Sequence, residues 1–423
     1  MAQYQITVDG EILHQLFRGD EGVAKLLECV LNQVLEAQVG EHIKAEPYER
    51  THERVGYRNG YREREMKTRV GTLELRVPRV RSGSFSTELF DRYQRSEQAL
   101  ILALMEMVIN GVSTRKVRRI TEELCGTSFS KSTVSALCKA LDPVVSGWNG
   151  RSLKDKRFPF IIVDAMQLKI RKEDRVVPQS ALIAVGVNEE GYREVLGLMV
   201  GDSESEATWS EFFRWLIARG LHGVDLVVSD HHGGLVNAAK RHFQGVAWQR
   251  CQVHFMRNIM DACPKRYHDT LKAKLRLMFN APDIKTARGL LDDIVSEYAQ
   301  TAPRAVTCLE AGFDDAMAVM ALPEPYRRRL RSTNGLERLN REVRRRERVI
   351  GIFPNIDSAL RLLGALLMEQ DEEWAIGRHY FRMDAYWEHK RSESNDNLLR
   401  RSPNETPQPK FELNSRETNL HRI

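Results

Sequence analysis

The chain has 423 residues, 42% hydrophobic and 29% charged, and its net charge is +6. This length exceeds one simple core, so we expect two or three domains. It contains no run of eighteen apolar residues and no basic-then-apolar leader, so the sequence predicts neither a membrane span nor a secretory signal. The six cysteines lack a framework spacing, which indicates reduced thiols in a cytosol.

Residues 1–95 are predicted to be an N-terminal helical and basic region with a short strand segment. Apolar side chains recur at helical spacing between Val23 and Val34, and GTLELRVPRVR alternates as a half-exposed strand does. Tyr48–Arg81 holds ten Lys or Arg against five Glu, with tyrosines interleaved. Such clustering is typical of a surface that meets a polyanion, although a solvated charged face is the alternative.

Residues 96–150 are predicted to form a DNA-binding region with a helix-turn-helix. An apolar helix capped by Ser96 is followed by a helix over Thr114–Leu124, a turn at Gly126, and a second helix capped by Ser130. Helix pairs that merely pack together share this pattern. The candidate DNA contacts are Arg115, Lys116, Arg118, Arg119 and Lys131.

The remaining sequence predicts a multidomain α/β protein. After a linker over 143–156, residues 155–254 contain three strand-like runs and then alternate helix and strand, which indicates a mixed sheet with helices on its faces. Residues 255–324 read as helical throughout and would be an insertion before the final helices over 325–388. The polar, Pro- and Asn-rich segment 389–423 is predicted to be disordered.

Three acids stand out along this second part of the chain. Asp164 and Asp230 are predicted at the ends of apolar strands, and Glu337 opens a helix. Such carboxylates can converge to hold two divalent ions for phosphodiester chemistry, and oxygen ligands favour Mg²⁺ or Mn²⁺ over zinc. The alternatives are turn-forming aspartates and a capping box between Asn334 and Glu337.

The helix that Glu337 opens is strongly basic. Pro323–Gly351 holds ten Arg and four Glu. Glu337 and Asn340 share one face of this helix with arginines that suit a phosphate backbone; these are Arg341, Arg344, Arg345 and Arg348. Together with the acids, this face predicts metal-dependent chemistry on nucleic acid.

Two further features have less certain roles. Cys251-x-x-His254 ends a predicted strand, but a zinc site would need two more ligands. Cys263 and His268 are the candidates, and their spacing is short for a zinc knuckle, so we do not favour that site. Trp209 lies on an amphipathic helix, where a core position is favoured over a base-stacking platform.

The ordered set VDAMQLKI, ESEATWSEFF, VVSDHHGG, WQRCQVHFMRN and STNGLERLNREVRRR resembles the Mutator-type family of bacterial insertion-sequence transposases. The resemblance covers roughly residues 50 to 380 and implies a DDE enzyme with a ribonuclease-H-like core. It implies that Asp164, Asp230 and Glu337 are the catalytic acids and metal ligands. It also matches Cys251 and His254 to the family's C/D-x-x-H signature, with Trp209 as a family tryptophan.

This resemblance implies an enzyme that binds the terminal inverted repeats of an insertion sequence, nicks their ends and transfers the freed 3′ hydroxyl to target DNA. It further implies two Mg²⁺ or Mn²⁺ ions, double-stranded DNA partners, a homodimer or higher assembly on DNA, no membrane association, and a cytoplasmic, nucleoid-associated location. Two alternatives remain open from the residues themselves. One is a non-catalytic DNA-binding regulator that uses 96–142, and the other is a resolvase or structure-selective nuclease.

Overall fold

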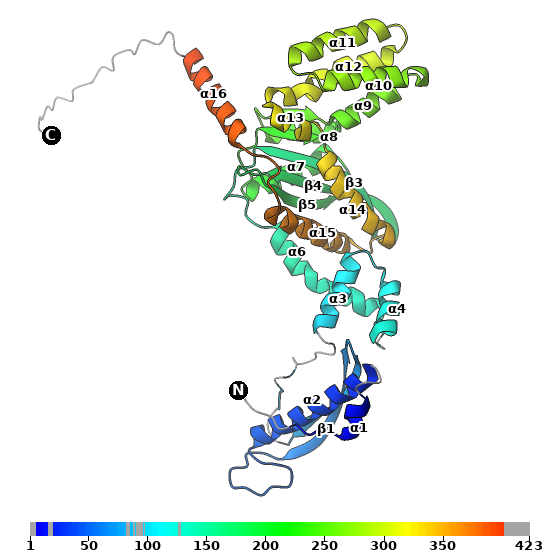
Figure 1. The fold of residues 1–423 in the computed structure, drawn as a ribbon, viewed down its shortest axis with the longest axis vertical. Coiled ribbons are helices and arrows are strands. Elements are labelled where there is room, and N and C mark those ends of the chain that lie inside the picture. The colour runs from blue at the N-terminus through cyan, green and yellow to red at the C-terminus, as the bar shows by residue number, and fades with distance from the viewer. Residues whose placement is uncertain are drawn as a thin grey trace, which may run out of the picture.

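The computed structural model describes residues 6–15, 20–81, 85–87, 89, 96, 98–125 and 128–401. The molecule is elongated, with a small N-terminal unit at one end and a block of helices at the other (Figure 1). A sheet flanked by helices lies between them. Within the described residues, no helix is both long enough and apolar enough to cross a membrane.

The N-terminal unit is a hairpin covered by a helix. Its elements are α1 (Gly10–Gln15), α2 (Asp20–Ile43), β1 (Arg58–Thr68) and β2 (Gly71–Val80). Leu35 of α2 packs on Leu73 and Leu75 of the predicted strand β2. Strand β1 was not predicted, because RNGYREREMKT is mostly charged and shows no apolar alternation. Antiparallel pairing with β2 through a tight turn, in which Gly71 has φ +129°, holds it in place.

Four helices connect this unit to the sheet: α3 (Gln98–Ile109), α4 (Thr114–Cys125), α5 (Lys131–Cys138) and α6 (Asp142–Asn149). The predicted helix over 114–124 and the predicted cap are confirmed, since the Ser130 hydroxyl accepts a hydrogen bond from the Thr133 amide. The predicted turn at Gly126 lies outside the described residues. The predicted linker was wrong over its first half, because Pro143 is tolerated in the first turn of α6.

The central sheet has the strand order β5-β4-β3-β6-β7. Its strands are β3 (Phe160–Lys172), β4 (Arg175–Val187), β5 (Arg193–Gly201), β6 (Leu226–Ser229) and β7 (Ala247–Arg250). Strands β3, β4 and β5 pair antiparallel, whereas β3, β6 and β7 pair parallel. The predicted mixed α/β sheet is therefore confirmed.

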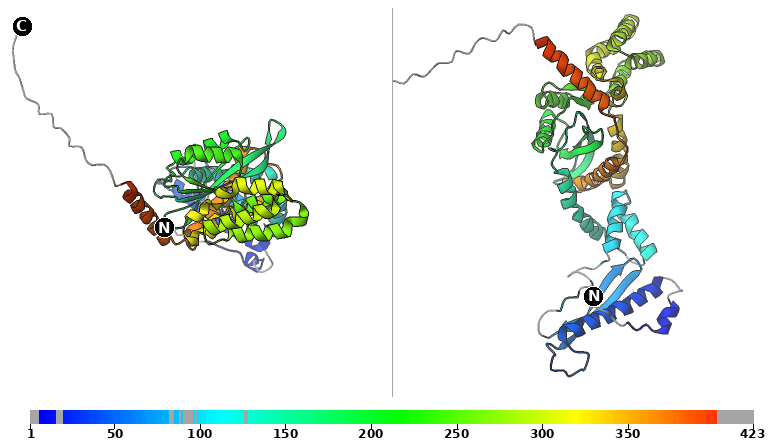
Figure 2. Two further views of the ribbon diagram at one scale, coloured as in Figure 1. Left: turned by 90° about the horizontal axis from the view of Figure 1, so that it is seen from above. Right: turned by 60° about the vertical axis from the view of Figure 1, so that its left-hand side comes forward.

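Helices cover both faces of this sheet (Figure 2, right). One face packs on α7 (Glu206–Ala218) and α8 (Gly233–His242), and the other packs on α13 (Glu324–Leu330), α14 (Asn334–Ile350) and α15 (Ile356–Ile376). Successive side chains of β3 point alternately to the two faces of the sheet. Ile161 and Val163 join the α7 side, whereas Ile162 and Met166 join the α14 side. Asp164 therefore belongs to the face that α14 covers.

The predicted helical block is confirmed as helical, and it begins earlier than expected. It consists of α9 (Gln252–Asp261), α10 (His268–Phe279), α11 (Ile284–Tyr298) and α12 (Pro303–Met317), which share their own hydrophobic core. The predicted strand VAWQRCQV ends at Arg250, and Cys251 is already the N-cap of α9. Short 3-10 helices lie at Lys139–Leu141 (η2), Lys265–Tyr267 (η3) and Ala318–Ala321 (η4).

The prediction of disorder from residue 389 was wrong for its first part. Helix α16 runs over Asp384–Arg401 and begins from a buried turn, where Phe381, Met383 and Tyr386 join the core beside α13. The polar composition of this segment predicted disorder, but the buried first turn holds it as a helix. Residues 402–423 lie outside the described part of the chain.

Candidate active site

Parallel pairing sets Asp164 and Asp230 level with each other. Ile162 of β3 stands opposite Val228 of β6, and each aspartate comes two residues later. Asp230 directly follows β6, as predicted. The prediction that Asp164 ends a strand was wrong, because β3 continues to Lys172 as an antiparallel hairpin with β4. Asp164 instead lies just beyond the point where pairing with β6 stops.

The Asp164 carboxylate is held on two sides by neutral donors. Its Oδ1 accepts from the Ala165 amide at 2.9 Å, and its Oδ2 accepts from Asn340 Nδ2 at 2.8 Å. Asn340 is only 5% exposed and belongs to α14. Burial raises the pKa of Asp164 to about 6, an effect that a bound cation would offset.

His254 connects the second and third acids. It lies in the first turn of α9, with Nδ1 3.8 Å from Asp230 Oδ1 and Nε2 3.5 Å from Glu337 Oε1. Its interaction with the Cys251 thiol, supported by the two carboxylates, raises the pKa of His254 to about 9. The structure thus brings all three predicted acids into one neighbourhood, since Asn340 and Glu337 are one helical turn apart on α14.

Cys251, the N-cap residue of α9, is fully buried next to His254. The backbone amide and the hydroxyl of Thr333 each donate to its Sγ at 3.4 Å. Burial opposes ionisation of Cys251, but hydrogen bonds from His254 and Thr333 outweigh it and lower the pKa of the thiol. Possible ligand atoms of Cys251, His254 and Glu337 all lie within 4.8 Å of one another, the one such group in the described residues.

Two of the alternatives raised by the sequence are wrong. Cys263 and His268 do not complete a zinc knuckle, because the His268 ring instead contacts the Cys263 carbonyl oxygen at 3.0 Å. The capping box is also absent. Thr333, not Asn334, is the N-cap residue of α14, and no side chain caps it. The Glu337 carboxylate instead faces His254, and its Oε1 also accepts from the Thr333 hydroxyl at 3.5 Å.

Comparison with known proteins places the chain in a family. The family model described as "Transposase, Mutator family" matches residues 2–377. The chain belongs to the Mutator family of transposases. This confirms the resemblance read from the sequence and supports a role in DNA transposition.

Several curated members of the family are similar over most of the chain. The transposase for insertion sequence element IS256 in transposon Tn4001 of Staphylococcus aureus is 45% identical, covering 91% of this chain and 100% of the relative. The ISRM5 transposase of Rhizobium meliloti is 43% identical, covering 91% and 96%. The IS1081 transposase of Mycobacterium tuberculosis is 42% identical, covering 79% and 81%.

Among solved structures, the Drosophila P element transposase strand transfer complex matches at 11% identity and a TM-score of 0.30. The match covers 74% of this chain and 88% of that one. This similarity is too low to bear on the site.

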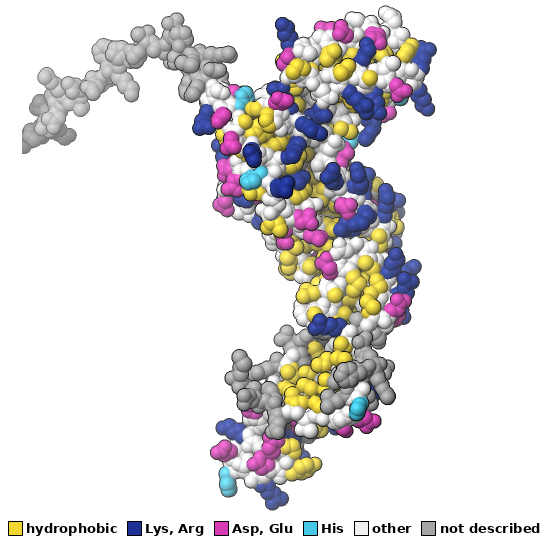
Figure 3. All heavy atoms as spheres, viewed as in Figure 1, with side chains coloured by type: hydrophobic (Ala, Val, Ile, Leu, Met, Phe, Trp, Pro, Cys, Tyr) yellow, Lys and Arg dark blue, Asp and Glu magenta, His cyan; other side chains and the backbone are white. Residues whose placement is uncertain are grey.

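Helix α14 presents its predicted arginines to solvent. Basic side chains gather along the edge of the molecule that α14 and α4 share (Figure 3). The four predicted phosphate contacts are all exposed: Arg341, Arg344, Arg345 and Arg348. Asn340, which the sequence placed among them, instead turns inward to Asp164. Its position three residues after Glu337 was the signal that could have revealed this role.

The predicted contacts of α4 and α5 are also exposed: Arg115, Lys116, Arg118, Arg119 and Lys131. Two of them are engaged within α4, because Arg118 pairs with Glu122 at 2.9 Å and Arg119 pairs with Glu123 at 3.6 Å. Competition with these glutamates would weaken their contacts with phosphate. The remaining three are the stronger candidates for DNA contacts.

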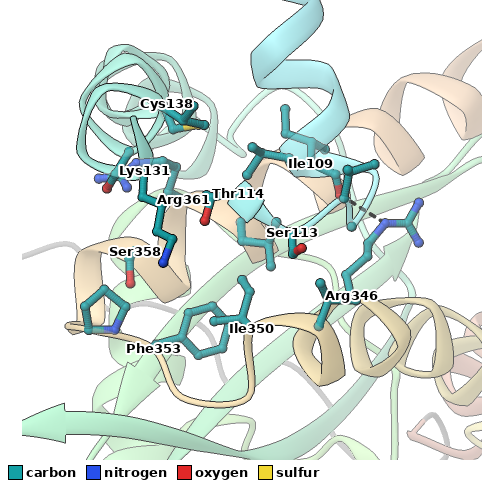
Figure 4. Close-up of a pocket in the computed structure, with 18 of the residues that line it drawn as sticks. Ile109, Ser113, Thr114, Lys131, Cys138, Arg346, Ile350, Phe353, Ser358 and Arg361 are labelled. Atoms are coloured by element: carbon teal, nitrogen blue, oxygen red, sulfur yellow. Dashed lines mark hydrogen bonds between the residues drawn. The ribbon is translucent and has the colours of Figure 1, made fainter. Parts of the chain in front are cut away.

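A pocket of about 590 Å³ lies where these helices meet the far end of α14 (Figure 4). Ser113, Lys131 and Ile350 line it, and Arg346 beside it donates to the Ile109 carbonyl oxygen at 3.2 Å. Arg346 is nine residues beyond Glu337, which is about 13 Å along a helix. The pocket is therefore separate from the acids and marks a junction between the helices and the sheet.

Trp209 belongs to the core, as favoured from the sequence. It is fully buried on α7 and stacks on Phe213, with ring centroids 5.6 Å apart. It offers no surface on which a base could stack.

Proposed function

We propose that the chain is a DDE transposase that binds the terminal inverted repeats of its element, nicks the DNA and joins the freed 3′ end to target DNA. One observation carries this proposal. Asp164, Asp230 and Glu337 come from three distant segments and lie together. The register of β3 and β6 aligns the two aspartates, His254 contacts Asp230 and Glu337, and Asn340 of α14 donates to Asp164. The strand order supports a ribonuclease-H-like core for it.

The donors fit a pair of hard divalent cations. Asp164, Asp230 and Glu337 supply only carboxylate oxygens, which suit Mg²⁺ or Mn²⁺, and the raised pKa of Asp164 indicates a carboxylate that a cation would stabilise. When bound, such ions supply the Lewis acidity that phosphodiester substitution needs. Asn340 fixes the orientation of Asp164, and His254 holds Asp230 and Glu337 near each other.

The exposed cations supply the proposed DNA contacts. The proposed contacts on α14 begin with Arg341, one turn after Glu337, so DNA bound along them would pass the acids. We assign residues 155–254 and 325–388 to the catalytic core, 255–324 to an inserted helical domain, and 96–150 to repeat recognition through α4 and α5. Since joining one element requires two ends, we propose at least a dimer on DNA, acting on the nucleoid.

The test uses the DNA that flanks the protein's own coding region. With Mg²⁺, we expect nicks at the element ends and joined products, and neither should form without metal. Asp230→Asn and Glu337→Gln should abolish both products while sparing DNA binding. Asp261→Asn, an exposed change at the end of α9, is the matched control. Binding without metal-dependent nicking would indicate a regulator, and nicking without joining would indicate a nuclease.

A further inference from the structure

The acid site contains a second set of ligands that includes sulfur. Cys251, His254 and Glu337 come from the N-cap of α9, its first turn and the first turn of α14, and their ligand atoms lie within 4.8 Å of one another. The thiol is fully buried, whereas the side chains of His254 and Glu337 are 19% and 30% exposed. The set therefore has a protected sulfur and an open side that an ion can enter.

We propose that Cys251, His254 and Glu337 form a zinc site. Thiolate, imidazole and carboxylate are the three ligand types that Zn²⁺ takes in proteins. Mg²⁺ takes oxygen ligands, so a site with a thiolate discriminates against it. The site differs from the knuckle considered from the sequence, because its third ligand comes from α14 and not from the Cys263 loop.

The surroundings of the three side chains favour a metal at this place. The Thr333 amide and hydroxyl point at Cys251 Sγ, and the Cys251 amide donates to the Ser229 carbonyl oxygen at 2.8 Å, which fixes the cysteine at the end of β6. Such outer contacts orient metal ligands. His254 Nδ1 is buried and makes no hydrogen bond with the described residues, and Asp230 Oδ1 lies 3.8 Å from it.

The site has three ligands, which favours an exchangeable ion over a structural one. Structural zinc sites are closed by four protein ligands, whereas three leave a position for water. Asp230 is not a fourth ligand beside Glu337, since it faces the ring nitrogen Nδ1 at 3.8 Å whereas Glu337 faces Nε2 at 3.5 Å. Two ligands of a tetrahedral Zn²⁺ lie roughly 3.5 Å apart. A side-chain closure of about 1 Å from the present separations would thus bring the three ligands onto one ion and leave the fourth position to water.

Glu337 belongs both to the zinc site and to the three proposed catalytic acids. If the proposed function holds, zinc binding therefore affects catalysis. A zinc ion that holds Glu337 against Cys251 withdraws it from Asp164 and Asp230. Zn²⁺ would then inhibit strand cleavage even in an excess of Mg²⁺. The transposase would thereby be restrained by available zinc.

The binding test uses the full chain, without DNA, and Co²⁺ as the spectroscopic probe. We expect a near-ultraviolet thiolate-to-cobalt absorption that saturates at one equivalent and is displaced by Zn²⁺. Cys251→Ser should remove the band, whereas Cys263→Ser, which alters another buried cysteine near the end of α9, should keep it. His254→Asn should weaken Co²⁺ binding by at least the roughly 10–100-fold that removal of an outer partner costs. No band in the parent, or a band that survives in folded Cys251→Ser, overturns the proposal.

The inhibition test compares each variant with its own zinc-free cleavage rate. Zn²⁺ should inhibit the parent and Cys263→Ser at concentrations that leave Cys251→Ser unaffected. Equal inhibition of Cys251→Ser would refute the role of this site. Failure of cleavage with Mg²⁺ alone would count against the transposase mechanism and would leave the cobalt result to decide the metal site.

Discussion

Asn340 is the residue whose role depends most on three-dimensional context. It donates to Asp164 Oδ2 at 2.8 Å from a nearly buried position on α14. Removal of such an outer partner typically costs 10–100-fold in metal affinity or activity. We therefore expect Asn340→Ala to raise the Mg²⁺ concentration for half-maximal nicking by roughly 10–100-fold. Asn334→Ala, an exposed change on the same helix, should match the parent, and an unchanged Mg²⁺ midpoint for Asn340→Ala would contradict this role.

Substitution of Trp209 can show whether this tryptophan stabilises the core or stacks on DNA bases. Its side chain is fully buried, since Phe212 and Phe213 pack against it on α7. Trp209→Ala should lower the free energy of unfolding by about 3–5 kcal/mol, and Trp209→Phe should cost less. Denaturant unfolding measures both. A stable Trp209→Ala variant with weakened binding of single-stranded DNA would instead identify a stacking platform.

At the scale of elements, α4 is the part of the helical region whose DNA contacts are easiest to test. Arg115 and Lys116 are exposed in its first turn. Removing one cation that neutralises a phosphate reduces the slope of log affinity against log salt by about 0.9. Arg115→Ala with Lys116→Ala should therefore weaken binding to the element ends and flatten this slope by about 1.8. Lys154→Ala with Lys156→Ala, an equal charge change before β3, should leave the slope unchanged.

Elements with a strong local pattern could be predicted, and elements held by a partner could not. The apolar runs of β3, β4 and β5 and the Ser130 cap are local signals, and the structure confirms them. Strand β1 depends on pairing with β2, and α16 depends on the anchor at Tyr386. The place of Asp164 within β3 depends on where the parallel pairing stops. None of these partners is visible in the segment itself.

At the scale of the whole molecule, the helical block must return the chain to the sheet so that α14 meets β3. Gln249 of β7 secures this return, donating to the Ala316 carbonyl oxygen at 2.7 Å and accepting from the Val319 amide at 2.6 Å. Gln249→Ala would leave the buried Val319 amide without this acceptor, at about 1–3 kcal/mol, whereas the Ala316 carbonyl oxygen would keep its bond from Gln252. We expect a clear fall in thermal midpoint and slower cleavage. Gln300→Ala, an exposed change just after α11, should alter neither, and a Gln249→Ala variant of parental stability would refute the role.

The sequence could name the three acids, but it could not show how they are joined. Their residue types and the basic helix after Glu337 pointed to one site. The connection through His254 is invisible in sequence, because the distances that define it join α9 to β6 and to α14. The same holds for Cys251, whose partner Thr333 is 82 residues away.

Iron-mediated cleavage of the protein can show whether Asp164, Asp230 and Glu337 hold the same metal ions. Fe²⁺ replaces Mg²⁺ in oxygen-ligand sites and, with peroxide and ascorbate, generates radicals that cut the backbone beside the metal. The structure predicts cuts near residues 164, 230 and 337 that Mg²⁺ suppresses and that weaken together in Asp230→Asn. Cuts at only one of these segments, or cuts unaffected by Asp230→Asn, would contradict a shared site.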